Sequence, residues 1–262
     1  MLTEAPMNPK ENREKMAQIM FETFNVPGLY IALQPSLVLY ASGKFTGFIL
    51  ELGEGVSQFC PILEGYQVHT AERIDFGGKD LSDYMAKILV DTGKRFTTVG
   101  EKMIAKTIKE KVCYVAYDLD DEIKSVEPFD YELPDGTNLI IKDQRIRCPE
   151  ILFNSENNIA KKCNDIIQKC DIDDRKDYYN CIILSGGNSM FNGLAERLTR
   201  EIKKLAPPSM EEEIKVIASP ERKLSAWIGG AFLSSISTFD STWITKTEYE
   251  ESGVTIVHKK IF

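Results

Sequence analysis

Two glycine-containing turns hold the residues of this sequence that are best suited to binding a phosphate group. Gly53-Glu54-Gly55 lies between two apolar segments, and glycine lets successive backbone N–H groups approach an anion closely. Ser185-Gly186-Gly187 follows the apolar run 181–184 and precedes a helical pattern, a position where α/β proteins commonly bind nucleotides. Each turn also has a purely structural interpretation, as a tight hairpin or as a strand-to-helix connection that needs glycine for steric reasons.

The segments on either side of these turns predict the elements that hold them in place. Residues 46–50 and 56–60 are expected to form two strands around the first turn. Residues 181–184 predict a buried strand, and apolar side chains at helical spacing over 194–205 predict the helix that follows the second turn.

Further helical patterns precede and separate these strands. Asn8 is expected to cap a helix over residues 8–24, and Asp80 is expected to cap an amphipathic helix over residues 80–89. Another helix is predicted over about 101–114. Strands that alternate with helices in this way indicate an α/β fold.

Composition excludes several classes of function. The chain has 262 residues and a net charge of −8 without clustered Lys and Arg, which argues against a nucleic-acid partner. Its six cysteines and two histidines do not have the spacing of a zinc site, and scattered thiols favour a reducing compartment. No stretch approaches the roughly 18 apolar residues of a membrane span, and the charged start is unlike a secretory signal. We therefore expect a cytoplasmic protein without a membrane partner, with the nucleus as the alternative location.

Longer motifs in the sequence resemble those of the actin family. The first of them is LTEAPMNPKENREKMAQIMFETFNVPGLYIALQ, near the start of the chain. The others follow in the actin order and are IKEKVCYVAYD, YELPDG, RCPE, LSGGNSMFNGLAERL, PERKLSAWIGG and YEESGVTIVHKKIF. The similarity therefore runs over effectively the whole chain.

This resemblance implies the two-lobed ATPase fold shared with Hsp70 chaperones and sugar kinases, in which each lobe contains a ribonuclease-H-like sheet. In actins, ATP and a divalent cation, magnesium or calcium, lie between the lobes. Residues 1–41 and 225–262 would belong to the first lobe, as in actin subdomain 1. Residues 42–76 and 157–224 would form the base of the second lobe, as in subdomain 3, and residues 77–156 its tip, as in subdomain 4.

The resemblance carries over most of the adenine and ribose pocket. Lys109 and Glu110 match the Lys-Glu pair that lines this pocket in actins, and Lys106 replaces the usual arginine. The remaining matches are the glycine turn, the methionine under the base, a phenylalanine in place of the usual tyrosine, and the lysine beside the adenine. These are Gly186, Gly187, Met190, Phe191 and Lys223.

The phosphate end matches the family less closely. Gln34 matches the glutamine that orients the attacking water, and Gly53 and Gly55 match the second phosphate loop. Glu51 and Glu54 replace aspartates, and an extra methylene moves a carboxylate by about 1 Å, enough to disturb a magnesium shell. No direct metal ligand is therefore expected, and Glu51 would act on the metal only through water.

One further replacement concerns hydrolysis. Gln58 stands where actins have a histidine that helps to position the water, and glutamine is no base near neutral pH. No part of the chain matches the family's first strand–glycine loop–strand, so we expect an incomplete first lobe. The apolar face of the helix over 8–24 would then be largely uncovered, and the polar stretch 154–162 replaces an apolar plug used in filaments. ATP or ADP binding is therefore expected to be weak or absent, with hydrolysis and self-polymerisation impaired.

Four apolar residues match the actin cleft, and the resemblance implies that they line a groove for partner helices; the alternative is that they belong to the core. They are Tyr40, Phe232, Leu233 and Ile236. Three functions remain open: an ATP-binding cytoskeletal actin of which this sequence is a truncated part, a non-polymerising actin-related adaptor, and a nonfunctional remnant. The partners expected in the first two cases are actin-family subunits or actin-binding proteins.

Overall fold

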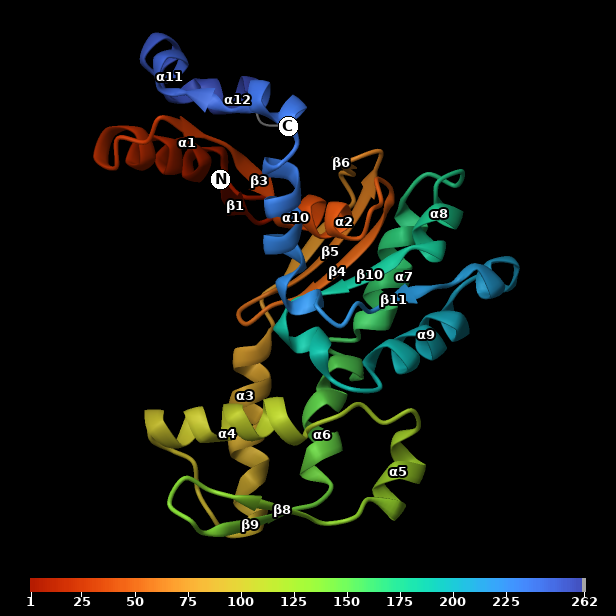
Figure 1. The fold of residues 1–262 in the computed structure, drawn as a ribbon. Helices are drawn as coiled ribbons and strands as arrows, with labels where there is room; N and C mark the ends of the chain where they lie inside the picture. Colours follow the sequence, from red (N-terminus) through yellow and green to blue (C-terminus); the bar gives the residue numbers. More distant parts are fainter. Residues whose placement is uncertain (261–262) are drawn as a thin grey trace.

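A six-stranded mixed sheet forms the centre of the molecule (Figure 1). The structure is a computed structural model and describes residues 1–260. The strand order is β11-β10-β4-β5-β6, with β7 also paired to β5; β10 is parallel to β4 and β11, whereas β4 and β5 form an antiparallel hairpin. The strands are β4 (Gly47–Leu52), β5 (Ser57–Leu63), β6 (Tyr66–Gln67), β7 (Glu72–Ile74), β10 (Ile182–Ser185) and β11 (Val216–Ile217).

Both faces of this sheet are covered by helices. Side chains on a strand alternate between its two faces, so neighbouring residues of β4 belong to different cores. Phe48 and Leu50 of β4 belong to the large core shared with α7 (Ile159–Lys169) and α9 (Leu194–Leu205). Ile49 points the other way, into a smaller core with residues of α2 (Gln34–Ala41). Helix α8 (Arg175–Asn180) leads into β10 and contributes Tyr178 and Tyr179 to the large core.

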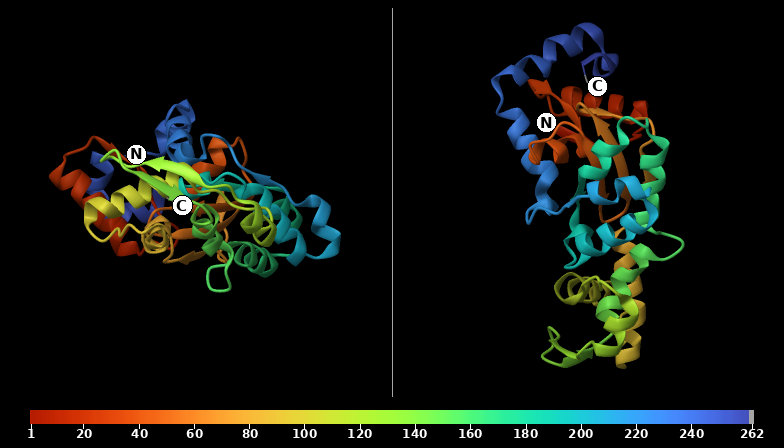
Figure 2. Two further views of the ribbon diagram at one scale, coloured as in Figure 1. Left: turned by 90° about the horizontal axis from the view of Figure 1, so that it is seen from below. Right: turned by 90° about the vertical axis from the view of Figure 1, so that its right-hand side faces the viewer.

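A helical group lies at one end of the sheet, and the right-hand view of Figure 2 shows that it makes the molecule elongated. Its core residues, among them Leu81, Ile108 and Leu139, are continuous with the large core of the sheet. The group consists of α3 (Gly78–Ile88), η2 (Leu89–Thr92), α4 (Val99–Val112), α5 (Leu119–Ser125), the hairpin β8 (Phe129–Glu132) and β9 (Asn138–Ile141), α6 (Gln144–Glu150) and η3 (Ile151–Phe153).

Residues 1–33 and 244–260 lie together at the opposite end (Figure 1). Their core contains Ala17 and Phe21, and the Phe21 ring stacks on Tyr249 with 4.4 Å between centroids. The elements are β1 (Leu2–Glu4), α1 (Lys10–Gln18), the π-helical η1 (Ile19–Thr23), β2 (Gly28–Leu29), β3 (Ile31–Leu33), β12 (Ile244–Thr245), α11 (Lys246–Ser252), η8 (Val254–Ile256) and α12 (Val257–Lys260). Strand β1 pairs in parallel with β3, and β2 pairs with β12.

Helix α10 (Ser225–Ser234) crosses α2 at very short range. A Cβ atom built on Gly229 would lie 1.9 Å from the backbone oxygen of Leu37, so only glycine fits at this crossing. The remaining short helical segments are η4 (Gly187–Met190), η5 (Pro208–Glu213), η6 (Arg222–Leu224) and η7 (Ser237–Thr242). No helix within residues 1–260 is long and apolar enough to span a membrane.

Two predicted helix caps are wrong. Asn8 does not cap α1, because Pro9 occupies the N-cap position and the Asn8 side chain donates to Glu4 instead. Asp80 does not occupy the N-cap of α3; it is the third helical residue, and its carboxylate accepts the N–H of the N-cap Gly77 at 2.8 Å. In both cases the neighbouring Pro or Gly has the extended backbone that an N-cap requires, so the polar residue bonds elsewhere.

The expected exposure of the first helix is only partly present. Ala17 and Phe21 are buried under the C-terminal elements, whereas Ile19 is 39% and Phe24 is 66% exposed. The helix changes from α to π geometry at Ile19, which rotates the following side chains away from the positions that regular helical spacing predicts.

Candidate functional site

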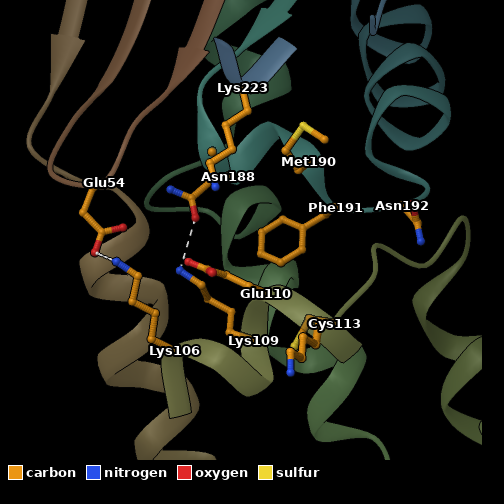
Figure 3. A pocket seen from close by; sticks show the side chains of 12 residues that line it. Glu54, Lys106, Lys109, Glu110, Cys113, Asn188, Met190, Phe191, Asn192 and Lys223 are labelled. Carbon is orange, nitrogen blue, oxygen red and sulfur yellow. Dashed lines mark hydrogen bonds and ion pairs between the residues drawn. The ribbon is translucent and has the colours of Figure 1, made fainter. Parts of the chain in front are cut away.

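A pocket of about 590 Å³ opens where the end of the sheet meets α4 (Figure 3). The predicted residues among its lining are Glu54, Lys106, Lys109, Glu110, Gly187, Met190, Phe191 and Lys223. The lining also includes four residues that sequence reasoning did not identify, Lys111, Cys113, Asn188 and Asn192.

Lys109 is the most unusual residue of this pocket. It lies on α4 and is only 1% exposed, yet it forms no ion pair with a carboxylate among the residues described. Its amine donates to the backbone oxygen of Gly78 at 2.9 Å and to the Oδ1 atom of Asn188 at 3.3 Å (Figure 3). Burial lowers the pKa of Lys109, because an ammonium group loses hydration in the interior. An anion bound in the pocket would compensate this charge.

Asn188 connects the two glycine turns that the sequence singled out. Its Nδ2 atom donates to the backbone oxygen of Gly53 at 2.6 Å, while its Oδ1 atom accepts from Lys109. The oxygen of Gly53 also accepts the N–H of Gly78 at 3.0 Å, at the start of α3. The β4–β5 turn, the β10–α9 turn and α4 are therefore held together around one side of the pocket.

Gly186 is required by the tight packing of the second turn. Its φ is +84°, and a Cβ atom would lie 2.4 Å from the backbone oxygen of Leu52. Gly187, the next residue, has no such contact and lines the pocket. The sequence therefore combines one glycine needed for packing with one that leaves backbone open to a ligand.

Glu54 and Lys106 face each other across the mouth of the pocket (Figure 3). The Oε1 atom of Glu54 and the Nζ atom of Lys106 are 2.8 Å apart, and this hydrogen bond is the main reason that the pKa of Lys106 is raised. On the other side, Met190 and the buried Phe191 give the pocket an apolar surface, and Lys223 of η6 reaches toward it from above.

Glu51 and Gln58 lie on neighbouring strands, directly opposite each other in the β4–β5 ladder. The Oε2 atom of Glu51 and the Oε1 atom of Gln58 are both buried, and neither has a hydrogen-bond partner among the residues described. Burial raises the pKa of Glu51 to about 7. Buried polar groups usually have hydrogen-bond partners, so these two oxygens are exceptions within the described part of the chain.

The comparison with protein families agrees with these observations. A family model described as Actin matches residues 1–262, the whole of the sequence. The chain belongs to the actin family. Members of the actin family generally bind a nucleotide together with a divalent cation, interact with other actin-family or actin-binding proteins, and are typically cytoskeletal. The mixed sheets and helices described above are those of an actin-type α/β fold.

The actin-like residues predicted for the base and ribose converge in the structure, but those predicted for hydrolysis lie elsewhere. Gln34, Glu51 and Gln58 are not among the described residues that line the pocket. Gln34 begins α2, and its side chain donates to Thr3 at 3.3 Å. Gly53, Gly55 and Gly186 belong to the two turns that contribute Glu54 and Gly187 to the pocket, but they are not among its lining residues.

The signal that could have identified Asn188 is its place in the second turn. A polar side chain directly after Gly186-Gly187 is close to any ligand that the turn binds, and its amide can both donate and accept. Lys111, Cys113 and Asn192 had no such signal, because their proximity depends on how α4 ends beside the start of α9. Within residues 1–260 no group of three His, Cys, Asp or Glu side chains could hold a metal directly.

Replacing Glu51 with glutamine is expected to stabilise the protein near neutral pH and to have little effect in acid. The pKa of Glu51 is raised from 4.5 to about 7 by burial. The Glu51 carboxyl group therefore loses its proton at a lower pH in the unfolded chain than in the folded protein. As a result, it lowers the stability of the folded protein progressively as pH rises from 4.5 to about 7. The destabilisation removed by the variant is about 3 kcal/mol at most.

Urea unfolding of the wild type and Glu51→Gln at about pH 4 and about pH 7.5 would measure this difference. Glu132→Gln, which changes an exposed carboxyl on β8, is the matched control. A gain in stability that is the same at both pH values would show that Glu51 does not titrate as described.

Proposed function

We propose that this actin-family protein binds an adenine nucleotide in the pocket beside α4, with its phosphates toward the β4–β5 turn. The observation that carries the proposal is Lys109, a buried ammonium group in the pocket without a carboxylate partner among the described residues. A phosphate group supplies the missing negative charge and the remaining hydrogen-bond acceptor.

The surrounding charges support the same ligand. Lys106 is already paired with Glu54, but the Lys111 and Lys223 side chains form no ion pair within residues 1–260. Among the described lining residues, Glu110 is the one carboxylate without an ion pair. The pocket is therefore basic in a protein whose net charge is −8. Attraction of this kind favours an anionic ligand over a neutral one.

Backbone and apolar groups complete the proposed site. Glu54 and Gly55 are exposed residues at the tip of the hairpin, and their N–H groups donate to no acceptor among the described residues, so these groups can donate to a phosphate. Met190 and Phe191 offer apolar surfaces against which a purine can pack.

The residues present also fit a divalent cation held through water. Glu51 and Gln58 would accept hydrogen bonds from its water shell, and the cation would neutralise phosphate charge. Gln58 has no group that titrates near neutral pH, so we propose nucleotide binding as the function and slow hydrolysis at most. Residues 42–76 and 157–224 would form the base of the nucleotide-binding lobe, residues 77–156 its tip, and residues 1–41 and 225–262 the facing lobe.

A partner-binding role is favoured by a separate observation on α10. Trp227 is 73% and Phe232 is 56% exposed on this helix, and large apolar side chains at such exposure are typical of contact surfaces. Leu233 of α10, Ile236 just after it and Tyr40 of α2 are half-buried. We propose that this surface binds actin-family subunits or actin-binding proteins of the cytoplasmic cytoskeleton.

ADP is expected to bind the protein and to raise its melting temperature, whereas adenosine, which lacks phosphates, binds at least tenfold more weakly. Isothermal titration with both ligands, in magnesium and again in EDTA, measures this difference. Binding of ADP no tighter than that of adenosine would contradict a phosphate site at Lys109, and a result independent of magnesium would remove the cation from the proposal.

A further inference from the structure

A second, smaller pocket adjoins the nucleotide pocket at the end of α4. It has a volume of about 360 Å³ and shares Lys111, Cys113 and Asn192 with the larger pocket. We propose that this side pocket binds a phosphate group, in addition to the phosphates bound near Lys109. This proposal depends on the proposed function only if the added phosphate is part of a nucleotide bound in the larger pocket.

Arg145 is the residue that points to an anion. Its guanidinium lies over the rings of Tyr114 and Phe129, 5.2 and 4.9 Å from their centroids. Its Nε atom donates to the backbone oxygen of Val112 at 3.2 Å, and one Nη atom makes a long contact of 3.5 Å with the backbone oxygen of Glu127. The side chain is therefore held in one orientation by rings and backbone.

The charge of Arg145 is not compensated by this arrangement. Within residues 1–260 it forms no ion pair, whereas the other arginine of α6, Arg147, pairs with Asp91 and Asp143. An arginine fixed in place without a carboxylate is suited to binding a phosphate through two N–H groups. The Glu122 carboxylate nearby is engaged by the Tyr114 hydroxyl at 2.7 Å and does not line the side pocket.

Lys111 supplies a second positive charge at the boundary between the two pockets. Its side chain is exposed and makes no ion pair or hydrogen bond among the described residues. No acidic side chain within the described part of the chain lines the side pocket, and the exposed amide of Asn192 can donate a hydrogen bond. Two unpaired cations beside a polar donor form a site for a phosphate dianion.

Two sources of this phosphate are compatible with the site. It is either a third phosphate on the ribose of a nucleotide that occupies the larger pocket, or a free phosphate compound bound beside that nucleotide. Titration of the full chain at low ionic strength with ADP and 3′-phospho-ADP tests the first source. Titration of the ADP-saturated protein with inorganic pyrophosphate tests the second.

For the first source we expect 3′-phospho-ADP to bind about tenfold more tightly than ADP, because a charge-assisted hydrogen bond contributes on this scale. The advantage should fall below about twofold in Lys111→Gln and in Arg145→Gln. For the second source, pyrophosphate should bind the ADP-saturated protein and lose its affinity in the same variants. Lys161→Gln, an exposed lysine of α7 outside both pockets, is the control.

Arg145→Gln also removes the contacts with two rings, so Lys111→Gln, which changes an exposed side chain, decides the question if the arginine variant folds poorly. Equal affinity for ADP and 3′-phospho-ADP, together with no pyrophosphate binding, would overturn the side-pocket proposal and leave nucleotide binding intact. Failure of ADP to bind, with pyrophosphate binding that Lys111→Gln abolishes, would overturn the proposed function and leave the side pocket intact.

Discussion

Replacing Lys109 with methionine is expected to weaken ADP binding by roughly a hundredfold while changing the stability of the free protein by only about 1 kcal/mol. The two effects differ because the lysine has opposite roles in the two states. With phosphate bound, its ammonium group forms a buried charge-assisted contact. Without a ligand, it is an unpaired charge held out of water, and its lowered pKa reflects that penalty.

Methionine preserves the length and apolar stem of the side chain but removes the charge. The Oδ1 atom of Asn188 then loses its donor, which costs some stability, whereas the oxygen of Gly78 keeps the Ser82 hydroxyl at 2.7 Å. Removal of a desolvated ammonium offsets this loss.

Titration with ADP and urea unfolding of the same preparation measure the two quantities. Lys102→Met is the matched control, because Lys102 lies on the same helix but is exposed and paired with Asp83. If Lys109→Met binds ADP as the wild type does, the nucleotide does not contact this lysine, and the proposed site is wrong.

Replacing Gly229 with alanine is expected to destabilise the protein by about 3 kcal/mol or more, whereas the same change at Gly230 should be neutral or slightly stabilising. The added methyl at Gly229 would lie 1.9 Å from the backbone oxygen of Leu37, so α10 and α2 would have to move apart. At Gly230 the nearest atoms are the Met1 sulfur at 3.5 Å and a Leu37 methyl at 3.6 Å, which are ordinary contacts.

The comparison isolates the helix crossing, because both substitutions raise helix propensity by the same amount on the same helix. A loss of about 3 kcal/mol corresponds to a fall in melting temperature of roughly 6–12 °C for a chain of this size. Thermal and urea unfolding of the two variants would measure it. Equal stability of Gly229→Ala and Gly230→Ala would show that the two helices are not in close contact at this point.

The local features of the site could be predicted from sequence because they depend on neighbouring residues. The hairpin around Gly53-Glu54-Gly55 and the turn at Gly186-Gly187 follow from glycines between apolar runs, and the structure confirms both. Resemblance to actins then identified Lys109 and Phe191, which line the pocket. Neither periodicity nor spacing would have identified these two.

Features that depend on distant parts of the chain could not be predicted in this way. The bond from Lys109 to Asn188 joins residues that are 79 positions apart, and nothing in either segment indicates it. The same is true of Arg145, whose guanidinium is held beside the side pocket by its contacts with the rings of Tyr114 and Phe129. The two helix-cap predictions were wrong for a different reason. Pro9 and Gly77 occupy the N-cap positions that were expected for Asn8 and Asp80.

The bond from Asn188 to Gly53 has a consequence for the order in which the protein folds. It spans 135 residues, and β10 inserts between β4 and β11 only after the intervening helical group has been synthesised. Contacts of such sequence separation close late and slow the folding of mixed sheets. Until then β4 has an open edge, a state that favours association between nascent chains. We therefore expect this protein to depend on protection during synthesis more than a helical protein of the same length does.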